Sequence, residues 1–251
     1  MVDRLFADAR LAALYDAWSP RAQRTDFDFY MPMVMAADAV LDVGCGTGAM
    51  LHEARRAGHA GRLCGLDPAA GMLAQARRRT DIEWVRGDLE SNKWAREFDL
   101  VVMTGHAFQV LIEDNQIRGA LAAVSAALRK NGRFAFETRN PAARAWESWT
   151  PENAVAIADA QGATVRITTE VDDRFDGRIV SFTHTFTSGD WDEPAISRST
   201  LRFLSADDLS SFLAEAGLRI EQQFGDWDRQ PLTAASPEII TVACLRQPRS
   251  R

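Results

Sequence analysis

Cysteine is scarce in this 251-residue chain, which has only Cys45, Cys64 and Cys244. These three residues are far apart and show no Cys-x-x-Cys spacing, so they predict neither a disulfide framework nor a zinc site. We expect no bound metal. Unpaired cysteines suit a reducing compartment, and we therefore expect the protein in the cytoplasm.

The chain also lacks a long apolar run and a surplus of positive charge. No stretch approaches the roughly 20 apolar residues that span a bilayer, and the start, Met1 to Phe6, lacks the basic and then apolar pattern of an export signal. The formal net charge is −6. Because nucleic-acid binding draws on clustered basic residues, we expect a soluble protein without a membrane or nucleic-acid partner.

The most informative stretch is Val40–Gly48, where a short apolar strand ends in an acid and breaks into alternating glycines. Glycine lets a ligand approach the main chain closely, and the free N–H groups at the start of the following helix face that ligand. On spacing alone, Gly44, Gly46 and Ala49 also fit the dinucleotide pattern G-x-G-x-x-G/A. Other residues must decide between the possible ligands.

Asp42, before the first glycine, favours a zwitterionic ligand over a dinucleotide, because its carboxylate repels a pyrophosphate and attracts an amino group. Here the chain resembles the class I methyltransferases that use S-adenosylmethionine (AdoMet), whose first motif reads much as Asp42–Gly48 does. The resemblance covers about residues 40–137. It implies AdoMet as cofactor and S-adenosylhomocysteine as product, with Asp42, Gly44 and Gly46 among the binding residues.

Asp67 ends a second predicted strand, Arg62–Asp67, 19 residues beyond Gly48. A carboxylate at the tip of the second strand of a βαβ unit can accept hydrogen bonds from both hydroxyls of a ribose. This holds for AdoMet and for NAD alike. Asp67 therefore indicates a nucleoside ligand without choosing between the two.

The resemblance implies further cofactor residues. Met72 would flank the adenine, although its helical spacing favours packing in the core. Asp88, with Leu89 beside it, follows the third strand, where the family places an acid on the adenine amino group. Thr104 follows the fourth predicted strand, Phe98–Met103, and loops at the carboxyl ends of parallel strands line the ligand crevice.

An amphipathic helix is predicted from about Asp3 to Trp18, ahead of Ser19-Pro20. In the resembling family a leading helix often closes over the cofactor, so Tyr15 could reach the methionine carboxylate; simple packing is its alternative. Tyr30 belongs to a second aromatic cluster and could border the acceptor, although core packing is the commoner role for such a side chain.

Two loops at the carboxyl ends of strands carry candidates for the acceptor side. His106 follows the fourth strand and could act as a general base, since histidine takes a proton near neutral pH; a structural hydrogen bond in the loop is its alternative. Arg139 follows the fifth strand, predicted over Gly132–Glu137, and could bind a carboxylate or phosphate of the acceptor. A salt bridge with Glu137 or another neighbour is the alternative for Arg139. The helix before this strand is predicted to end at Asn131-Gly132.

From about Trp146 to Leu204 the pattern changes to alternation with period two, and Asp176-Gly177 suits a tight turn. This predicts antiparallel strands inserted after the fifth strand. His184 falls on their apolar face, where a core role is expected. Two final strands over 218–224 and 238–245 match the methyltransferase fold, whose last strand inserts antiparallel between its predecessors.

Length and composition agree with a single packed unit, since 46% of the 251 residues are hydrophobic. We predict one α/β methyltransferase domain over residues 1–251, built on a Rossmann-like seven-stranded sheet. Residues 146–204 are predicted to form an antiparallel β elaboration that caps the substrate side.

Two other functions are open to a chain with this glycine turn. One is an NAD(P)-dependent oxidoreductase, but neither Tyr15 nor Tyr30 forms the Tyr-x-x-x-Lys pair of short-chain dehydrogenases. The other is a protein that binds AdoMet without turnover. The Asn-Pro-Pro-Tyr-type signature of DNA and protein amide methylation is absent after the fourth strand. We therefore predict methylation of a small-molecule acceptor at nitrogen or oxygen, and the sequence leaves the acceptor and the oligomeric state open.

Overall fold

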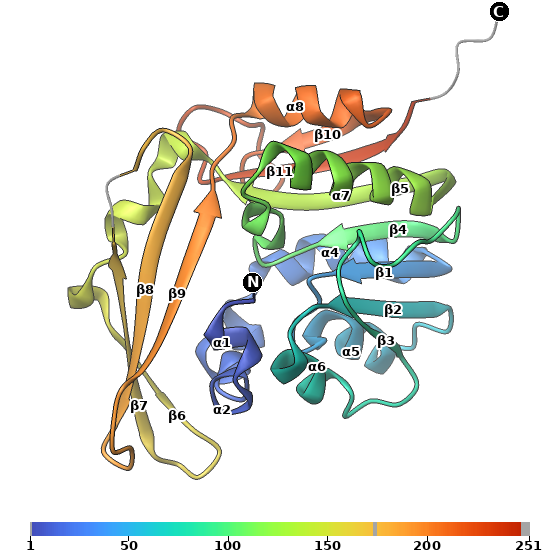
Figure 1. Ribbon diagram of the computed structural model, residues 1–251. Helices are drawn as coiled ribbons and strands as arrows, with labels where there is room; N and C mark the ends of the chain where they lie inside the picture. The colour runs from blue at the N-terminus through green and yellow to red at the C-terminus, as the bar shows by residue number, and fades with distance from the viewer. Residues whose placement is uncertain (1, 173–174, 247–251) are drawn as a thin grey trace, which may run out of the picture.

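The computed structural model describes residues 2–172 and 175–246 and contains two β-sheets (Figure 1). The strands of the larger sheet are β1 (Ala39–Val43), β2 (Arg62–Asp67), β3 (Glu83–Arg86), β4 (Phe98–Met103), β5 (Leu128–Arg139), β10 (Leu218–Phe224) and β11 (Glu238–Leu245). Their spatial order is β10-β11-β5-β4-β1-β2-β3. Strands β1 to β5 run parallel, whereas β11 is antiparallel to both β5 and β10. The predicted Rossmann-like sheet with an inserted antiparallel last strand is confirmed.

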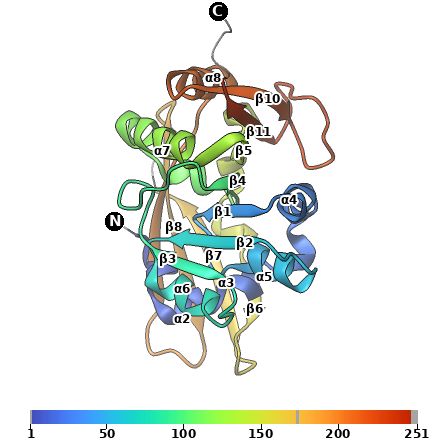
Figure 2. The same cartoon turned by 90° about the vertical axis from the view of Figure 1, so that its right-hand side faces the viewer.

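Helices cover both faces of this sheet. They are α4 (Thr25–Ala36), α5 (Ala49–Arg56), α6 (Ala70–Ala76), α7 (Asp114–Ala127) and α8 (Ala206–Glu215). Figure 2 shows α4 and α5 on one side of the sheet and α7 on the other. Neighbouring residues of β1 face opposite layers, since Val40 packs with α4 and α5 while Leu41 packs with α7 and α8. Among the described residues, no helix is both long and apolar enough to cross a membrane.

The fifth strand starts earlier than the sequence predicts. Strand β5 begins at Leu128, which has extended backbone angles (φ −71°, ψ 133°) and pairs with Phe98, so the preceding helix ends at Ala127 rather than at residues 131–132. A Cβ added to Gly132 would lie 2.9 Å from the carbonyl oxygen of Phe98. This glycine therefore permits a close approach between two strands instead of ending a helix.

Four strands form the smaller sheet, in the order β6-β7-β8-β9 and antiparallel throughout. They are β6 (Val155–Ala158), β7 (Thr164–Val171), β8 (Ile179–Ser188) and β9 (Ala195–Arg202). Residues 173–174 of the β7–β8 connection lie outside the described residues. Beyond them, Gly177 has a φ of +98° and the carboxylate of Asp176 accepts hydrogen bonds from the N–H groups of Arg178 and Ile179, as a tight turn requires. The predicted antiparallel elaboration is present.

The chain also contains short helical turns. They are η1 (Arg21–Gln23), η2 (Ala107–Val110), η3 (Pro141–Ala143), η4 (Ala145–Ser148) and η5 (Pro151–Asn153). The last three lie between β5 and β6, so the chain leaves the carboxyl end of β5 and continues directly into the smaller sheet. One face of this sheet is apolar and buries Phe182 and Phe186, and His184 on the same face is 9% exposed, in agreement with its expected core role.

The N-terminal segment is three short helices, α1 (Arg4–Ala7), α2 (Ala9–Ala12) and α3 (Tyr15–Trp18), and the predicted continuous helix is wrong. Asp8 causes the first break. Its backbone is extended, and its carboxylate accepts hydrogen bonds from the N–H groups of Arg10 and Leu11, which caps α2. Helices α1 and α2 contact α6, and α1 also contacts β9, so this segment lies between the core and the smaller sheet (Figure 1).

Candidate active site

A small cavity of about 40 Å³ lies at the carboxyl ends of β1 and β4. Its wall includes Gly44, Gly46 and Thr47 of the glycine turn and Thr104 after β4. Gly44, Gly46 and Gly48 all have φ between +55° and +75°, a region that residues with a Cβ rarely adopt. A Cβ on Gly44 would lie 2.8 Å from the Cβ of Ala107, so glycine is also needed there for close packing. The turn therefore leaves its main chain open to a ligand.

The carboxylate of Asp42 lines the same cavity and lacks a partner for one of its oxygens. Asp42 is 2% exposed, and within the described residues no hydrogen bond reaches its Oδ1. Burial raises the pKa of Asp42 to about 7, against the opposing effect of the Arg24 guanidinium. A buried acceptor without a donor is costly. The site is therefore complementary to a ligand that carries an ammonium group.

Arg24 and Tyr15 enclose the cavity from the N-terminal segment. The guanidinium of Arg24 donates to both oxygens of Asp26, at 2.6 Å and 2.9 Å. A Cβ added to Gly105 would lie 3.7 Å from Nη2 of Arg24 and 4.0 Å from the hydroxyl oxygen of Tyr15. A cationic donor and a hydroxyl thus face the glycine turn from the opposite wall, and together they suit a carboxylate.

Asp67 ties the tip of β2 to this turn. Its Oδ2 accepts a hydrogen bond from the backbone N–H of Gly46 at 2.9 Å, and its Oδ1 accepts one from the N–H of Ala69 at 2.8 Å. Burial raises the pKa of Asp67, and the two backbone donors oppose that rise. Each carboxylate oxygen keeps a lone pair beyond the one these bonds use, so Asp67 can still accept from a ligand hydroxyl.

A second group of polar side chains lies at the ends of β4, β5 and β11. Nε2 of His106 lies 3.0 Å from both carboxylate oxygens of Glu238, the first residue of β11. The backbone N–H of His106 donates to Oε1 of Glu137 at 2.8 Å, and the hydroxyl of Tyr30 donates to Oε2 of the same carboxylate. His106 itself has a φ of +62°, so its position in the loop depends on these contacts.

Burial sets the protonation of this group. It lowers the pKa of His106 to about 3, assisted by the Arg139 guanidinium, and raises the pKa of Glu238 to about 7. The imidazole is therefore neutral at pH 7, and its contact with Glu238 is a hydrogen bond rather than an ion pair. Because the two groups share this bond, proton uptake near neutral pH belongs to the pair, with the carboxylate as the more basic member.

Comparison with known proteins finds methyltransferases. A sequence profile described as "Methyltransferase domain" matches residues 40–132. Aklanonic acid methyltransferase DauC of Streptomyces sp. (strain C5) is 32% identical over 139 residues, which cover 49% of this chain and 61% of that relative. The chain is thus similar to methyltransferases, over residues 40–132 to the domain profile and over about half of its length to DauC.

Two solved structures share the fold of this chain. The CcbJ methyltransferase from Streptomyces caelestis superimposes with a TM-score of 0.76 at 18% identity, over 98% of this chain and 100% of that one. SAM-bound CalS10, an amino pentose methyltransferase from Micromonospora echinaspora, superimposes with a TM-score of 0.67 at 24% identity, over 93% of this chain and 96% of that one. The chain spans about three fifths of the length of DauC. The structural likenesses therefore extend over the whole fold, including the smaller sheet.

The residues expected near adenine lie apart from the small cavity. Met72 is 1% exposed and packs with Phe6 and Tyr15 of the N-terminal segment, and Leu89 is 5% exposed in the main core. Asp88 is exposed, and its Oδ1 accepts from the N–H of Ser91 at 2.8 Å. No hydrogen bond to Oδ2 of Asp88 occurs among residues 2–172 and 175–246, so this oxygen is available to a ligand.

Tyr30 and Arg139, the two residues expected on the acceptor side, lie in different surroundings. Tyr30 is fully buried and contacts Glu137, so its side chain does not border an open acceptor space. Arg139 has no carboxylate within 4.0 Å among the described residues; its guanidinium donates to Oε1 of Gln109 at 3.1 Å and lies 5.3 Å from the centre of the Trp149 ring. The alternative salt bridge between Arg139 and Glu137 is absent there.

Sequence reasoning missed Arg24 and Glu238. Arg24 sits in an Arg-x-Asp sequence that resembles an exposed ion pair, and nothing local shows that it faces the glycine turn. Glu238 is 132 residues from His106, and only the insertion of β11 beside β5 brings them together. Knowledge that the last strand inserts next to the fifth could have placed Glu238 near the site. In residues 2–172 and 175–246, no group of three or more His, Cys, Asp or Glu side chains could hold a metal ion.

Proposed function

We propose that this chain transfers the methyl group of AdoMet to a nitrogen or oxygen atom of a small-molecule acceptor. The observation that carries the proposal is the buried, unpartnered oxygen of Asp42 beside the glycine turn, opposite Arg24. Such a site fits the ammonium and carboxylate of a methionine moiety. It does not fit a pyrophosphate, which a carboxylate repels. The residues present therefore fit AdoMet better than NAD.

The proposed roles of the cofactor residues follow from their positions. Asp42 accepts from the ammonium, and Arg24 and Tyr15 hold the carboxylate. Gly44, Gly46 and Thr104 give the cofactor close contact with the main chain. On the nucleoside side, Asp67 accepts from the ribose hydroxyls, Asp88 accepts from the adenine amino group through Oδ2, and Met72 and Leu89 border the ring.

The cavity of about 40 Å³ is far smaller than a cofactor of this size needs. Tyr15 of α3 and Arg24 after η1 close it from one side, and both belong to the N-terminal segment. We therefore expect this segment to shift outward when the cofactor enters. Its division into short helices around Asp8 suits such a shift, because each break can absorb a change of backbone angles.

When bound, AdoMet supplies a methyl group on a sulfonium, which is already a good leaving group. Alignment of the acceptor therefore provides much of the catalysis. The His106–Glu238 pair is the proposed general base, because it can take the proton that the acceptor nitrogen or oxygen loses. The carboxylate of Glu137 accepts a hydrogen bond from the backbone N–H of His106 and another from the hydroxyl of Tyr30. Tyr30 is therefore a positioning residue that acts on His106 through Glu137.

Arg139 is the proposed anchor for an anionic group of the acceptor. It is a partly buried guanidinium that lacks a carboxylate partner within 4.0 Å in the described residues, and it lies beside the pair that we assign as base. The smaller sheet, with residues 146–204, is the proposed acceptor-side cap. The acidic net charge of −6 supports a small molecule rather than nucleic acid as acceptor, and the free cysteines support a reducing compartment such as the cytoplasm.

The names of two similar proteins support a small-molecule acceptor. DauC acts on aklanonic acid, and CalS10 acts on an amino pentose. The test is release of S-adenosylhomocysteine during incubation with AdoMet and a panel of small amines, phenols and alcohols. Acceptor-dependent release supports the proposal. The protein could instead bind AdoMet and release no S-adenosylhomocysteine with any acceptor, including a small-molecule extract of the cells that produce it. That result would favour a binding protein without turnover.

A further inference from the structure

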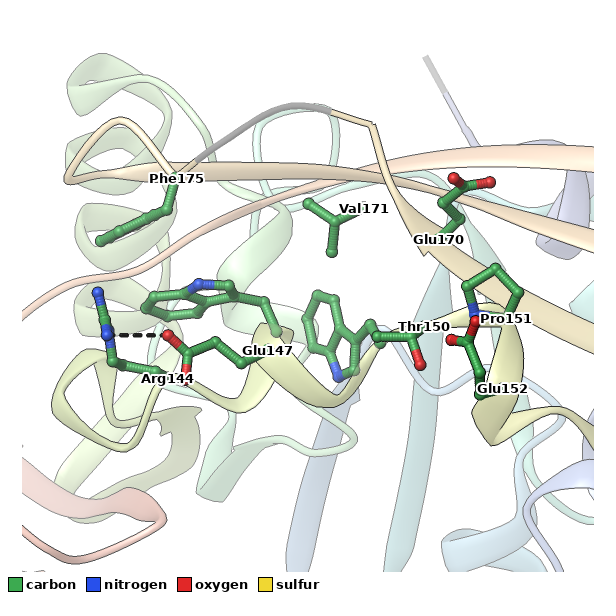
Figure 3. Close-up of a pocket in the computed structure, with 10 residues that line it drawn as sticks. Arg144, Glu147, Thr150, Pro151, Glu152, Glu170, Val171 and Phe175 are labelled. Atoms are coloured by element: carbon green, nitrogen blue, oxygen red, sulfur yellow. Dashed lines mark ion pairs between the residues drawn. The ribbon is translucent and has the colours of Figure 1, made fainter.

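A large pocket of about 610 Å³ lies between η4, η5 and β7, separate from the small cavity at the glycine turn. Three aromatic side chains line it, Trp146, Trp149 and Phe175. The ring centres of Trp146 and Phe175 are 4.3 Å apart. Figure 3 shows Phe175 and Val171 along one side of the pocket and Thr150 and Pro151 at its other end. Its volume is within the range of small-molecule sites, about 300–1,000 Å³.

The lining of the pocket holds more acidic than basic residues. The pocket is lined by Glu147, Glu152 and Glu170, and by a single basic residue, Arg144. Arg144 is already paired with Glu147 at 2.8 Å, as the dashed line in Figure 3 marks. Glu152 and Glu170 form no salt bridge among the described residues. Two uncompensated carboxylates beside aromatic faces attract a cation and repel an anion.

Contacts between side chains join this pocket to the proposed site of methyl transfer. Trp149, which lines the pocket, also packs against Arg139, whose Cζ lies 5.3 Å from the centre of the Trp149 ring. The ring centres of Trp149 and Phe182 are 4.7 Å apart, and those of Phe182 and His184 are 5.0 Å apart. The ring centre of His184 in turn lies 4.8 Å from that of Trp18. Trp18 is in the same short helix as Tyr15, which lines the small cavity. A chain of contacting side chains therefore connects the pocket with the transfer site, although none of the described residues lines both the pocket and the small cavity.

We propose that this aromatic and acidic pocket binds the distal end of the methyl acceptor, and that this end is a ring-bearing organic cation, an amine protonated at neutral pH. The ring packs against Trp146, Trp149 and Phe175, and the cationic nitrogen faces Glu152 and Glu170. Aromatic faces combined with carboxylates are the arrangement by which proteins recognise ammonium groups. That the bound cation is the methyl acceptor rests on the proposed function. The cation site itself is tested by binding alone.

The direct test is titration calorimetry of the intact protein with three probes of one shape: phenethylamine, phenethyltrimethylammonium and the neutral 2-phenylethanol. We expect both cations to bind with a dissociation constant of about 1 mM or tighter. The alcohol is expected to bind at least about threefold more weakly. The preference for the cations is expected to shrink as salt is raised, because exposed charges are screened. Equal binding of the alcohol and the amines would overturn the proposal.

Two sets of variants place the binding in this pocket. Glu152→Gln combined with Glu170→Gln is expected to weaken binding of both cations about threefold to tenfold and to leave the alcohol unchanged. Glu193→Gln removes an exposed carboxylate outside this pocket and is the matched control, with no expected effect. Trp149→Leu is expected to weaken the cations about tenfold, and Trp149→Phe to restore most of that loss. Unchanged cation binding in the glutamate double variant would overturn the proposal.

AdoMet binding separates this inference from the proposed function. In the Glu152→Gln and Glu170→Gln double variant, AdoMet affinity is expected to stay within about threefold of the wild type, because these residues meet only the second substrate. Once an acceptor is found, its KM is expected to rise in this variant. If AdoMet binds normally and the cations do not bind at all, the pocket assignment fails while the proposed function stands. If AdoMet fails to bind, the proposed function fails, whatever the cations do.

Discussion

Nε2 of His106 lies 3.0 Å from both carboxylate oxygens of Glu238, across 132 residues of sequence. The imidazole is held neutral by burial, which lowers its pKa to about 3, and the carboxyl has its pKa raised to about 7. A base of this kind is deprotonated, and therefore active, only above about pH 7. The pair rather than the histidine alone sets the pH dependence that we expect of the reaction.

Replacement of His106 tests this pair. His106→Ala and His106→Asn are expected to lower turnover by about 10²-fold or more while AdoMet affinity stays within about threefold. Asparagine tolerates the positive φ of this position, so His106→Asn separates loss of the base from strain in the loop. The measurement is the rate of S-adenosylhomocysteine release at saturating cofactor, with AdoMet affinity from calorimetry.

The pH–rate profile supplies the second measurement on the pair. Wild-type kcat/KM is expected to rise with pH through about 7, as the pair loses its proton, and Glu238→Gln is expected to abolish that acidic limb. If His106→Ala keeps a near-normal rate and the same profile, the pair is not the base, and alignment alone accounts for catalysis.

Asp42→Asn is expected to stabilise the protein and to weaken its binding of AdoMet. The folded pKa of Asp42 is about 7 and its ordinary value 3.8, so the folded state holds the proton more tightly than the unfolded state. The stability that the protonated form gives is present below about pH 4 and is lost as pH rises to about 7. Above pH 7 the wild type carries the full cost of a buried carboxylate, which asparagine avoids.

Thermal unfolding checks this prediction. At pH 8 without ligand, Asp42→Asn is expected to raise Tm by at least about 2 °C, and the gain is expected to shrink toward pH 5. Calorimetry is expected to show AdoMet affinity at least about tenfold lower in the variant. A variant that is less stable than the wild type at pH 8, or one that binds AdoMet normally, would show that Asp42 does not bind the ammonium group of AdoMet.

Arg24 is expected to bind the methionine carboxylate, and a pair of ligands tests this contact specifically. The wild type is expected to bind AdoMet at least about tenfold more tightly than decarboxylated AdoMet, since hydrogen bonds between charged groups contribute about 1.5–3 kcal/mol. Arg24→Gln is expected to bind the two ligands nearly equally. The control is Arg21→Gln, which removes a more exposed guanidinium that pairs with Glu53. A loss of affinity in Arg24→Gln that is equal for both ligands would indicate a structural role with Asp26 instead.

Asp67→Ala is expected to weaken AdoMet binding by at least about tenfold. Asp88→Ala is expected to weaken it less, because Asp88 is exposed and its contact with the adenine amino group competes with water. Calorimetry with AdoMet and with S-adenosylhomocysteine checks both variants. A larger loss in Asp88→Ala than in Asp67→Ala would reverse the assignment of the two acids.

The strands of the larger sheet and the tip residues of β1 and β2 could be predicted from local patterns, whereas the inserted last strand followed from the resemblance to the methyltransferases. Asp42 and Asp67 each end a short apolar run, and chain direction brings the carboxyl ends of parallel strands to one edge. The period-two pattern of Phe182, His184 and Phe186 similarly predicts one buried face. These are properties of a few adjacent residues.

The remainder depends on contacts between distant segments. The break at Asp8 was missed because helical spacing of apolar residues continues through it, and a side-chain cap overrides that spacing. Arg24 and Glu238 reach the site through packing of the N-terminal segment and insertion of β11, which no local pattern encodes. For Tyr30 both an acceptor-side and a core role stay open in the sequence, because its aromatic cluster gives no sign of which face is buried, and the structure buries its side chain fully.

The most direct test of the central claim, that this site is built for AdoMet, is titration calorimetry of the intact wild-type protein at pH 8 with AdoMet, S-adenosylhomocysteine and NAD. Both nucleosides that carry a methionine-type zwitterion are expected to bind at one site per chain, with NAD at least about 10²-fold weaker, because Asp42 repels its pyrophosphate. Absence of AdoMet binding, or tighter binding of NAD, would contradict the account.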